Sequence, residues 1–206
     1  MSAIATFRTN ISALLYDVSN VIFTTAEIDQ ALRWALSEYS LKRPMIKTYD
    51  YTVIGTTRVH TMPADFVTRH VTNVQLWDAD PDKYMDILFH AFLIDEQWTI
   101  QTRYEMKDGD VLQISYSAVH QVDGLDAAAG TTIPAADEPM LQIGAAGHAA
   151  QMRAVGTVES INMNANVVTN YRLLAADYLA RFTAALFAEP GIRVALPDFP
   201  DTSMRF

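Results

Sequence analysis

Residues 24–44 read TTAEIDQALRWALSEYSLKRP, and this stretch contains a helix start, a helical pattern and a helix stop. Thr24 followed by Glu27 is a capping-box pattern: the threonine oxygen accepts from the third backbone N–H, and the glutamate reaches back. Apolar residues then recur at three- and four-residue steps, as on one helix face: Ile28, Ala31, Leu32, Ala35, Leu36 and Tyr39. Pro44 disfavours helical geometry in the residue before it. The stretch therefore predicts an amphipathic helix that ends before Pro44.

The periodicity differs on the two sides of this helix. Upstream, Ile4, Phe7 and Ile11 have helical spacing, so we expect residues 3–42 to be helical. Downstream, the apolar period is two in the runs around residues 49–53, 71–77, 85–94, 98–104 and 111–119. These runs predict about five antiparallel strands. The sequence Lys107-Asp108-Gly109-Asp110 predicts a hairpin between the last two runs, because glycine accepts a positive φ.

The C-terminal part returns to helical patterns. Residues 121–134 are rich in Asp, Ala, Gly and Thr, which is typical of a loop, and Asp137 and Glu138 favour a helix start. The helix over residues 140–155 is rich in glycine and alanine, which indicates that another helix packs close to it. A strong apolar stripe over residues 167–186 predicts the last helix, which Pro190-Gly191 ends.

These patterns predict an α+β fold, a helical bundle formed by the N- and C-terminal helices with an inserted antiparallel β-sheet block. We expect the bundle to contain residues 1–45 and 135–188, and the β block residues 46–120. A loop over 121–134 and an extended C-terminal tail over 189–206 complete the division.

Composition excludes several classes of function. The chain has no cysteine, which excludes disulfides, thiolate nucleophiles and cysteine-based zinc sites. Its formal net charge is −9, and its 15 Lys and Arg residues are scattered, whereas tight binding to phosphates requires clustered basic residues. No segment approaches the ~20 apolar residues that span a bilayer, and the N-terminus lacks a signal-peptide pattern, so we expect a protein that is made in the cytoplasm, is not exported and does not bind a membrane.

The sequence contains no convincing catalytic or metal-binding motif. The segment Asp78-Ala79-Asp80-Pro81-Asp82 resembles the start of a calcium loop but lacks its glycine and glutamate. No serine lies in a nucleophile elbow, and no glycine-rich loop carries the lysine that holds phosphates. The five histidines have no zinc-site spacing, so structural or surface roles are expected for His60, His70, His90, His120 and His148. We expect no catalytic residue, no cofactor and no metal.

Five pieces of the sequence, in this order, resemble a known family. The first runs over residues 23–44 and contains Glu38-Tyr39-Ser40 and Arg43-Pro44. The others are MPADF at 62–66, YSAVH at 116–120, VDGLD at 122–126, and TTIP at 131–134 leading to Glu138. In order and spacing they resemble the head–tail connector proteins of tailed bacteriophages, over about residues 10–187. Each piece is a structural signature, and none is catalytic.

The resemblance implies a structural virion protein and not an enzyme. Such proteins are helical bundles with inserted β elements that assemble as a ring, commonly twelve-fold, beneath the portal protein and extend the DNA channel toward the tail. The implied partners are further copies of the chain, the portal protein and a downstream neck or tail protein, at the head–tail interface of the virion. DNA is expected to pass without specific binding, because an acidic channel repels phosphates.

The tail over residues 189–206 is the predicted partner-binding segment. Pro197 and Pro200 keep it extended, and it is too apolar to remain in water. We expect it to dock on the portal protein or on an adjacent copy, the alternative being that it folds back onto its own subunit. The predicted partner-binding residues are Ile192, Val194, Leu196, Phe199, Met204 and Phe206.

Three rival functions remain open. Another ring protein of the neck or tail, such as a stopper or tail terminator, would share most of these features. An enzyme with an unrecognised site would show a deep pocket with perturbed carboxylates. A host-encoded oligomeric binding module is the third, and a portal or capsid gene beside this gene would favour the connector over it.

Overall fold

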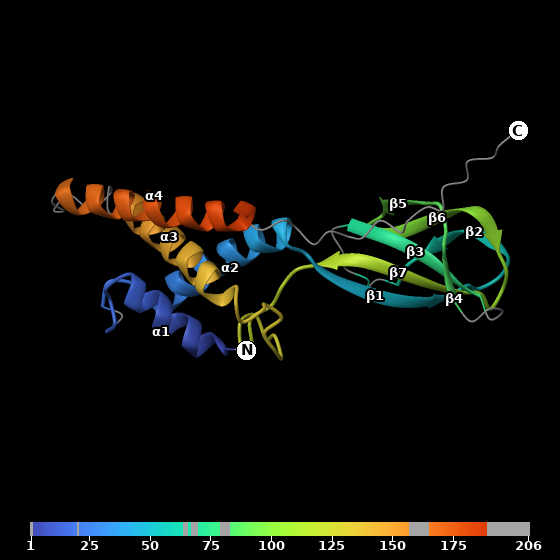
Figure 1. Cartoon of the computed structure of the whole chain (residues 1–206), viewed down its shortest axis with the longest axis horizontal. Coiled ribbons are helices and arrows are strands. Elements are labelled where there is room, and N and C mark those ends of the chain that lie inside the picture. Colours follow the sequence, from blue (N-terminus) through green and yellow to red (C-terminus); the bar gives the residue numbers. More distant parts are fainter. Residues whose placement is uncertain are drawn as a thin grey trace, which may run out of the picture.

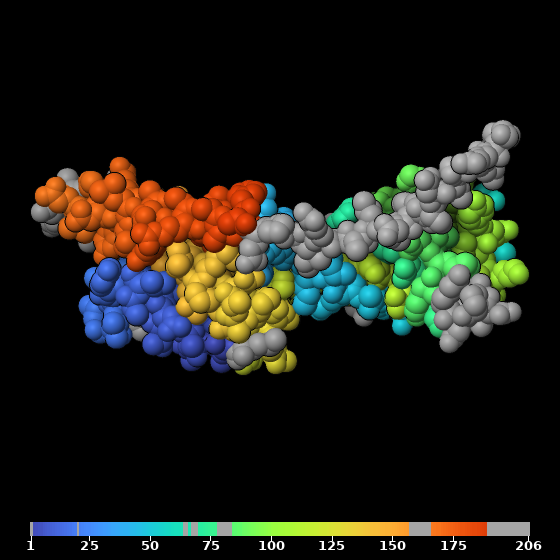
Figure 2. All heavy atoms as spheres, viewed as in Figure 1, coloured from blue at the N-terminus to red at the C-terminus, as the bar shows by residue number. Residues whose placement is uncertain are grey.

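The structure is a computed structural model, and it describes residues 2–19, 21–63, 66, 70–78, 83–156 and 165–188. Helices gather at one end of an elongated molecule and strands at the other (Figures 1 and 2). The chain passes from the helical unit to the β unit after Arg43 and returns near His120. The predicted α+β class, with N- and C-terminal helices around an antiparallel β block, is confirmed.

Among the residues that the structure describes, four helices form the helical unit: α1 Ile4–Leu14, α2 Thr25–Lys42, α3 Glu138–Gly156 and α4 Ala165–Ala188. The predicted capping box of α2 is present, because Thr24 Oγ1 accepts from Glu27 N at 3.3 Å and Glu27 Oε2 accepts from Thr24 N at 2.7 Å. The whole predicted stripe of α2 is buried, and the helix ends before Arg43-Pro44. Local signals therefore suffice to define this helix.

The small residues of α3 allow two helices to approach closely, as predicted. α3 packs against α1, α2 and α4. A Cβ added at Gly144 would lie 2.8 Å from the ring of Phe182 on α4, and one at Gly147 would lie 2.9 Å from Leu179 Cγ. Since real Cβ atoms do not approach so closely, α3 meets α4 at a distance that only glycine permits.

The segment between β7 and α3 has neither a helix nor a strand longer than an isolated bridge, as the loop prediction required. It is nevertheless part of the helical core, because Val122, Leu125 and Ile133 are buried among the helices. Ile4 N donates to Asp123 O at 2.9 Å, which fixes the start of α1 against this segment.

In the described part of the chain, seven strands form two antiparallel sheets, rather than about five strands in one block. The strands are β1 Met45–Thr52, β2 Thr57–Thr61, β3 His70–Asp78, β4 Lys83–Asp86, β5 Phe89–Ile94, β6 Gln97–Met106 and β7 Val111–Ala118. One sheet has the order β1-β7-β3-β4 and the other β2-β6-β5. Val74, Leu112 and Ile114 of the first sheet and Ile100 and Met106 of the second are buried in one core, which shares no residue with the helical core.

The predicted hairpin at residues 107–110 is wrong. Gly109 has the expected positive φ of 89°, but β6 and β7 belong to different sheets. The turn instead pairs with the end of β1, where Val53 N donates to Asp110 O at 2.8 Å. The two-residue hairpin lies between β5 and β6, at Asp95 and Glu96 with φ of 45° and 66°. The Asp-Gly pair indicates the turn geometry but does not determine which strands pair.

The predicted run over residues 85–94 is likewise divided between the two sheets. β4 ends at Asp86, and β5 begins at Phe89. Ile87 N donates to Val74 O in the first sheet, whereas Leu88 O accepts from Arg103 N in the second, both at 2.9 Å. The chain therefore crosses between the sheets at Ile87 and Leu88, which a continuous apolar run conceals.

Candidate assembly surfaces

The described residues contain no group of three or more His, Asp or Glu side chains that could hold a metal ion. Residues 79–82 of the calcium-like segment lie outside the described residues, and β3 and β4 on either side of it pair antiparallel. Among the described helices, none has the length and apolar character needed to cross a membrane. The surfaces of the two units and their junction are therefore the places to look for function.

Three of the five histidines are buried, each in a separate environment. His60 lies in the β core, where burial lowers the pKa of its imidazole. His148 lies 3.3 Å from Glu38 Oε1 and against the edge of Trp34, and burial lowers its pKa although Glu38 opposes this. These imidazoles are neutral at pH 7 and belong to packed interiors. The expected structural role agrees with these positions.

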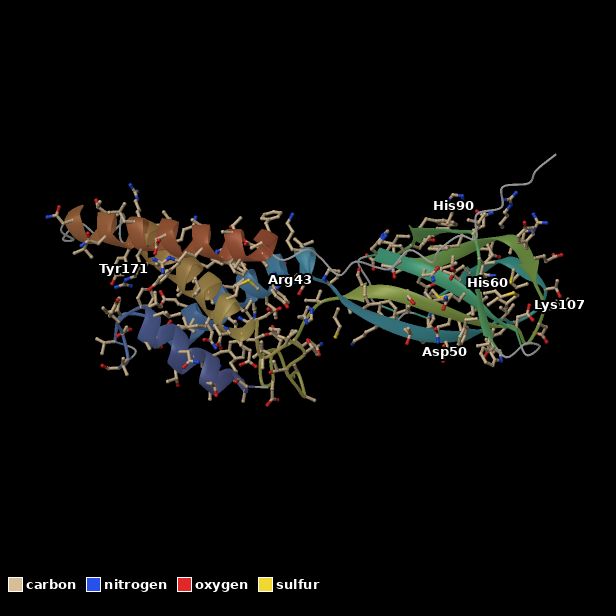
Figure 3. The ribbon with its side chains drawn as sticks, in the orientation of Figure 1. Arg43, Asp50, His60, His90, Lys107 and Tyr171 are labelled. Atoms are coloured by element: carbon tan, nitrogen blue, oxygen red, sulfur yellow. The ribbon has the colours of Figure 1, made fainter. Side chains whose placement is uncertain are left out.

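A cluster of polar groups lies where the helical unit meets the β unit (Figure 3). We call Tyr39, Arg43, His120 and Asp137 the junction cluster. Asp137 Oδ2 accepts from Tyr39 Oη at 2.5 Å and from Arg43 Nη1 at 3.2 Å. Arg43 Nη2 also donates to Ala185 O at 2.9 Å. One guanidinium therefore joins the end of α2, the start of α3 and the last turn of α4.

His120 completes the junction cluster from the returning chain. Its Nε2 lies 3.0 Å from Arg43 O, and its Nδ1 lies 3.1 Å from Thr132 Oγ1. Nδ1 also lies 3.2 Å from Thr132 O, so both ring nitrogens face backbone carbonyl oxygens, which only accept. Burial lowers the pKa of the His120 imidazole. Burial is also the main cause that raises the pKa of Tyr39, and its hydrogen bond to Asp137 is the second cause. Both side chains are therefore neutral at pH 7 and act as fixed hydrogen-bonding groups.

The C-terminal tail leaves the fold at this junction. All six predicted partner-binding residues lie outside the described residues, so their prediction is untested. The helix before them ends at Ala188, one turn after the bond between Arg43 and Ala185. Lys42 Nζ also lies 4.7 Å from the ring centroid of Phe187. These contacts hold the last turn of α4 against the end of α2, on the side from which the β unit extends.

An apolar loop is exposed at the end of the helical unit, between α1 and α2. Tyr16, Val18 and Val21 are 87%, 74% and 82% exposed. The loop is nevertheless held in place, because the Asp17 carboxylate accepts from three backbone N–H groups at 2.8–3.0 Å: Val21, Ile22 and Phe23. We call these three exposed side chains the distal apolar loop. Since it carries apolar side chains outward on a fixed backbone, it is a candidate contact surface.

The β unit exposes apolar side chains along β5 and beside β4. Leu88, Leu93 and Ile94 are at least half exposed. On the first sheet, the rings of Trp77 and Tyr84 lie 4.7 Å apart, beside a groove of about 730 Å³. The sequence indicates strand-like apolar runs here, but their exposure depends on which strands form the sheet edges. Neither surface could be identified as exposed before the topology was known.

Four arginines of the described residues are paired with carboxylates at 2.6–3.2 Å: Arg8, Arg33, Arg43 and Arg181. The formal net charge of −9 also opposes the binding of phosphates.

Comparisons with known proteins give a similarity to solved structures. No protein-family model and no curated protein matches the chain. Among solved structures, the chain is similar to a chain from the neck of an empty GTA particle computed with C6 symmetry. The identity is 14%, the alignment covers 82% of this chain and 88% of that chain, and the TM-score is 0.31. A similarity of that size leaves the role of this chain to be argued from its own residues.

Proposed function

We propose that this protein is a structural subunit of the neck of a phage-like particle. In this proposal it is a head–tail connector that assembles as a twelve-fold ring beneath the portal protein and extends the DNA channel toward the tail. The observation that carries the proposal is that the five sequence pieces behind the family resemblance contact one another in the fold.

The first contacts lie in the helical unit and join the first, fourth and fifth pieces. Arg33 of the first piece binds Asp126 of the fourth with Nη2–Oδ1 at 2.6 Å. Asp123 N of the fourth piece donates to Thr131 Oγ1 of the fifth at 2.9 Å. Residues separated by up to 93 positions are therefore in direct contact, which local sequence similarity alone does not require.

The remaining contacts include the β unit. The ring of Phe66 in the second piece lies 4.7 Å from that of Tyr116 in the third. The ring of His120, also in the third piece, lies 5.1 Å from that of Tyr39 in the first. The pieces thus form one connected set of contacts from the β core through the junction cluster to the helices. This is the arrangement expected if they resemble the connector family because of a shared fold.

The surfaces of the chain suit a ring subunit. The distal apolar loop in the helical unit and β5 in the β unit offer exposed apolar side chains, and the formal net charge is −9. We propose that copies meet through such apolar surfaces and that the tail residues predicted above dock on the portal protein or on an adjacent copy. Acidic residues facing the channel would let DNA pass without specific binding.

Deletion of the gene in the virus that encodes it tests this function. We expect heads filled with DNA and separate tails, which electron microscopy distinguishes from complete particles, and recovery when the full chain is supplied in trans. Complete infectious particles without the chain would contradict the proposal, and so would a block before heads form. Position within the neck, seen in the same particles, separates a connector from a stopper or tail terminator.

A further inference from the structure

The four edges of the two sheets differ in how well they are protected from further pairing. An edge strand presents unpaired backbone groups, and proteins protect such edges with charges, bulges or short strands. β1 carries Lys47 and Asp50, and β4 has only four residues. β2 carries Arg58, and its register shifts between Thr57 and Val59. Three edges are therefore protected in recognised ways.

The β5 edge has none of these features. β5 is six residues long, reads FHAFLI, and contains no charged residue and no proline. Its register with β6 is continuous from Phe89 to Ile94, and in the described part of the chain it has one neighbouring strand. Leu93 and Ile94 are 58% and 50% exposed, and the His90 side chain points outward (Figure 3). Such an edge is suited to accept another strand.

The chain contains a segment with the properties of such a strand. Residues 192–196 read IRVAL, with Ile192, Val194 and Leu196 on one side of the alternation, and Pro197 prevents the ladder from continuing. Eighteen residues follow Ala188, and in an extended form they reach about 60 Å. Length and pattern therefore fit an added strand of about five residues.

The directions of the two segments are also compatible. Thr52 pairs with Val111 at the end of the β unit away from the helices, where Lys107 lies (Figure 3). β6 begins at Gln97, which pairs with Ile94, and ends at Met106, next to Lys107. Because β5 is antiparallel to β6, β5 runs toward the junction. α4 ends at Ala188 beside the junction, so a tail that pairs with β5 would run away from the junction along the β unit. Rotation about the ring axis relates the copies, so the tail of a neighbouring copy makes the same angle with that axis. It would therefore run antiparallel to β5 as well.

We propose that, in the assembled ring, residues 192–196 of one copy add as an antiparallel fourth strand to the β5 edge of the adjacent copy. This inference rests on the proposed ring, and it identifies the receptor of the tail. The added strand covers the one unprotected edge of the sheet and links each copy to the next. Backbone hydrogen bonds hold it, and the alternate side chains of the segment select it.

Cysteine pairs test the inference, because the chain has no native cysteine. Two full-length variants are produced together in infected cells: His90→Cys, with an unchanged tail, and a set with one cysteine at each position from 192 to 196. A disulfide between the two variants forms only between copies, and it needs Cα atoms about 4.4–6.8 Å apart. Purified particles are analysed on a denaturing gel without reductant. We expect a cross-linked pair whose yield alternates along the five tail positions.

Val59→Cys is the matched control, because it lies on the opposite, protected edge of the same sheet and is 47% exposed. We expect it to give no more than background cross-linking. Leu93 lies on the face of β5 opposite to His90, so Leu93→Cys is expected to give the complementary alternation along the tail positions. If particles contain the chain but β5 cross-links no better than Val59→Cys, the strand addition is overturned and the neck function stands. A chain that carries both His90→Cys and Val194→Cys distinguishes the remaining case. If its disulfide forms only within one copy, the strand addition is also overturned, because the tail then folds back onto its own subunit. If particles lack the chain altogether, the neck function itself fails.

Discussion

The helical unit and the β unit differ in how their polar and apolar groups are used. In the helical unit, side chains far apart in sequence bind one another: Ser2 donates to Glu138, Arg8 binds Asp29, and Arg43 binds Asp137. In the β unit, a sheet edge and a groove expose Leu88, Leu93 and other apolar side chains. The helical unit is therefore fixed by internal contacts and presents the distal apolar loop at its surface, whereas the β unit offers an apolar sheet edge and a groove that a partner would cover.

This difference teaches which part of the molecule is expected to depend on its neighbours. Gly144 and Gly147 fix the distance between α3 and α4, and the junction cluster fixes the ends of three helices. The β unit is joined to this body by two segments of chain only. We therefore expect substitutions in the helical unit to change stability, and substitutions on β5 or in the tail to change assembly.

Removal of residues 192–206 has the largest expected effect on assembly. If the tail belongs to neither core, the truncated chain keeps nearly unchanged thermal melting and no longer attaches at the neck. Circular dichroism and quantitative mass spectrometry of purified particles measure the two outcomes. Unfolding of the truncated chain, or its normal presence in particles, would remove the distinction between stability and assembly.

Substitution Asp137→Ala has the largest expected effect on stability. It leaves Arg43 and Tyr39 without their shared acceptor in a position where both ion-pair side chains are under 20% exposed. We expect a loss of about 2–4 kcal/mol in the free energy of unfolding. Urea denaturation measures it, with Asp126→Ala as the matched control.

The control removes an ion pair that is shorter, at 2.6 Å against 3.2 Å, but more exposed: the side chains of Arg33 and Asp126 are 39% and 59% exposed. Exposed pairs contribute less than about 1 kcal/mol. Equal losses in the two variants would show that the junction cluster is no more important than a surface pair.

Substitution Gly144→Leu is expected to overpack the contact between α3 and α4. The added Cβ alone would lie 2.8 Å from three atoms of the Phe182 ring, so the helices must separate. We expect a loss of about 1–3 kcal/mol or more in the free energy of unfolding. Gly156→Ala, in the same helix but with nothing within 4 Å of the new Cβ, is the control. Unchanged stability of Gly144→Leu would mean that α3 and α4 do not meet as described.

Acidification is expected to weaken both units through their buried histidines. Burial lowers the pKa of His60 in the β unit and of His120 at the junction below the ordinary value of 6.5. Between the lowered pKa and 6.5, the unfolded chain therefore binds more protons than the folded chain, and stability falls as pH decreases through this window. Thermal unfolding between pH 7.5 and pH 5 measures the fall, and NMR titration assigns it. A flat profile over this range would contradict the burial of both imidazoles.

The smallest expected effect is binding to duplex DNA. Neither unit gathers basic residues, and the net charge is −9. We expect no retained complex at about 150 mM salt in a gel-shift or anisotropy assay, because non-specific affinity depends on neutralised phosphates. Sub-micromolar affinity under these conditions would show a basic surface that the pairing of the arginines does not suggest.

The sequence predicts those parts of the fold that depend on local chemistry. The capping box, the stripe of α2 and the close approach at Gly144 follow from residue type and spacing within one helix. The hairpin at Asp108-Gly109 was wrong because a positive φ does not determine which strands pair. The true turn at Asp95 and Glu96 has no glycine or asparagine, so it gave no signal.

The candidate surfaces were less predictable for a related reason. The junction cluster joins Tyr39 to Asp137 across 98 residues, and no local pattern reveals such a contact. The uncharged character of β5 is visible in its six residues, but its position at an edge depends on the order of strands in the sheet. The sequence showed that the tail is apolar and contains prolines. The β5 edge that we propose as its receptor could be located only from the order of the strands.

Cryo-electron microscopy of the neck of the particle that contains this chain tests the central claim most directly. Reconstruction without imposed rotational symmetry should show a closed ring of this chain between the portal protein and the tail, with the helical and β units resolved in each copy. The DNA channel should pass through its centre. A neck in which this chain forms no ring, or purified particles from which it is missing, would contradict the claim that it is a connector subunit.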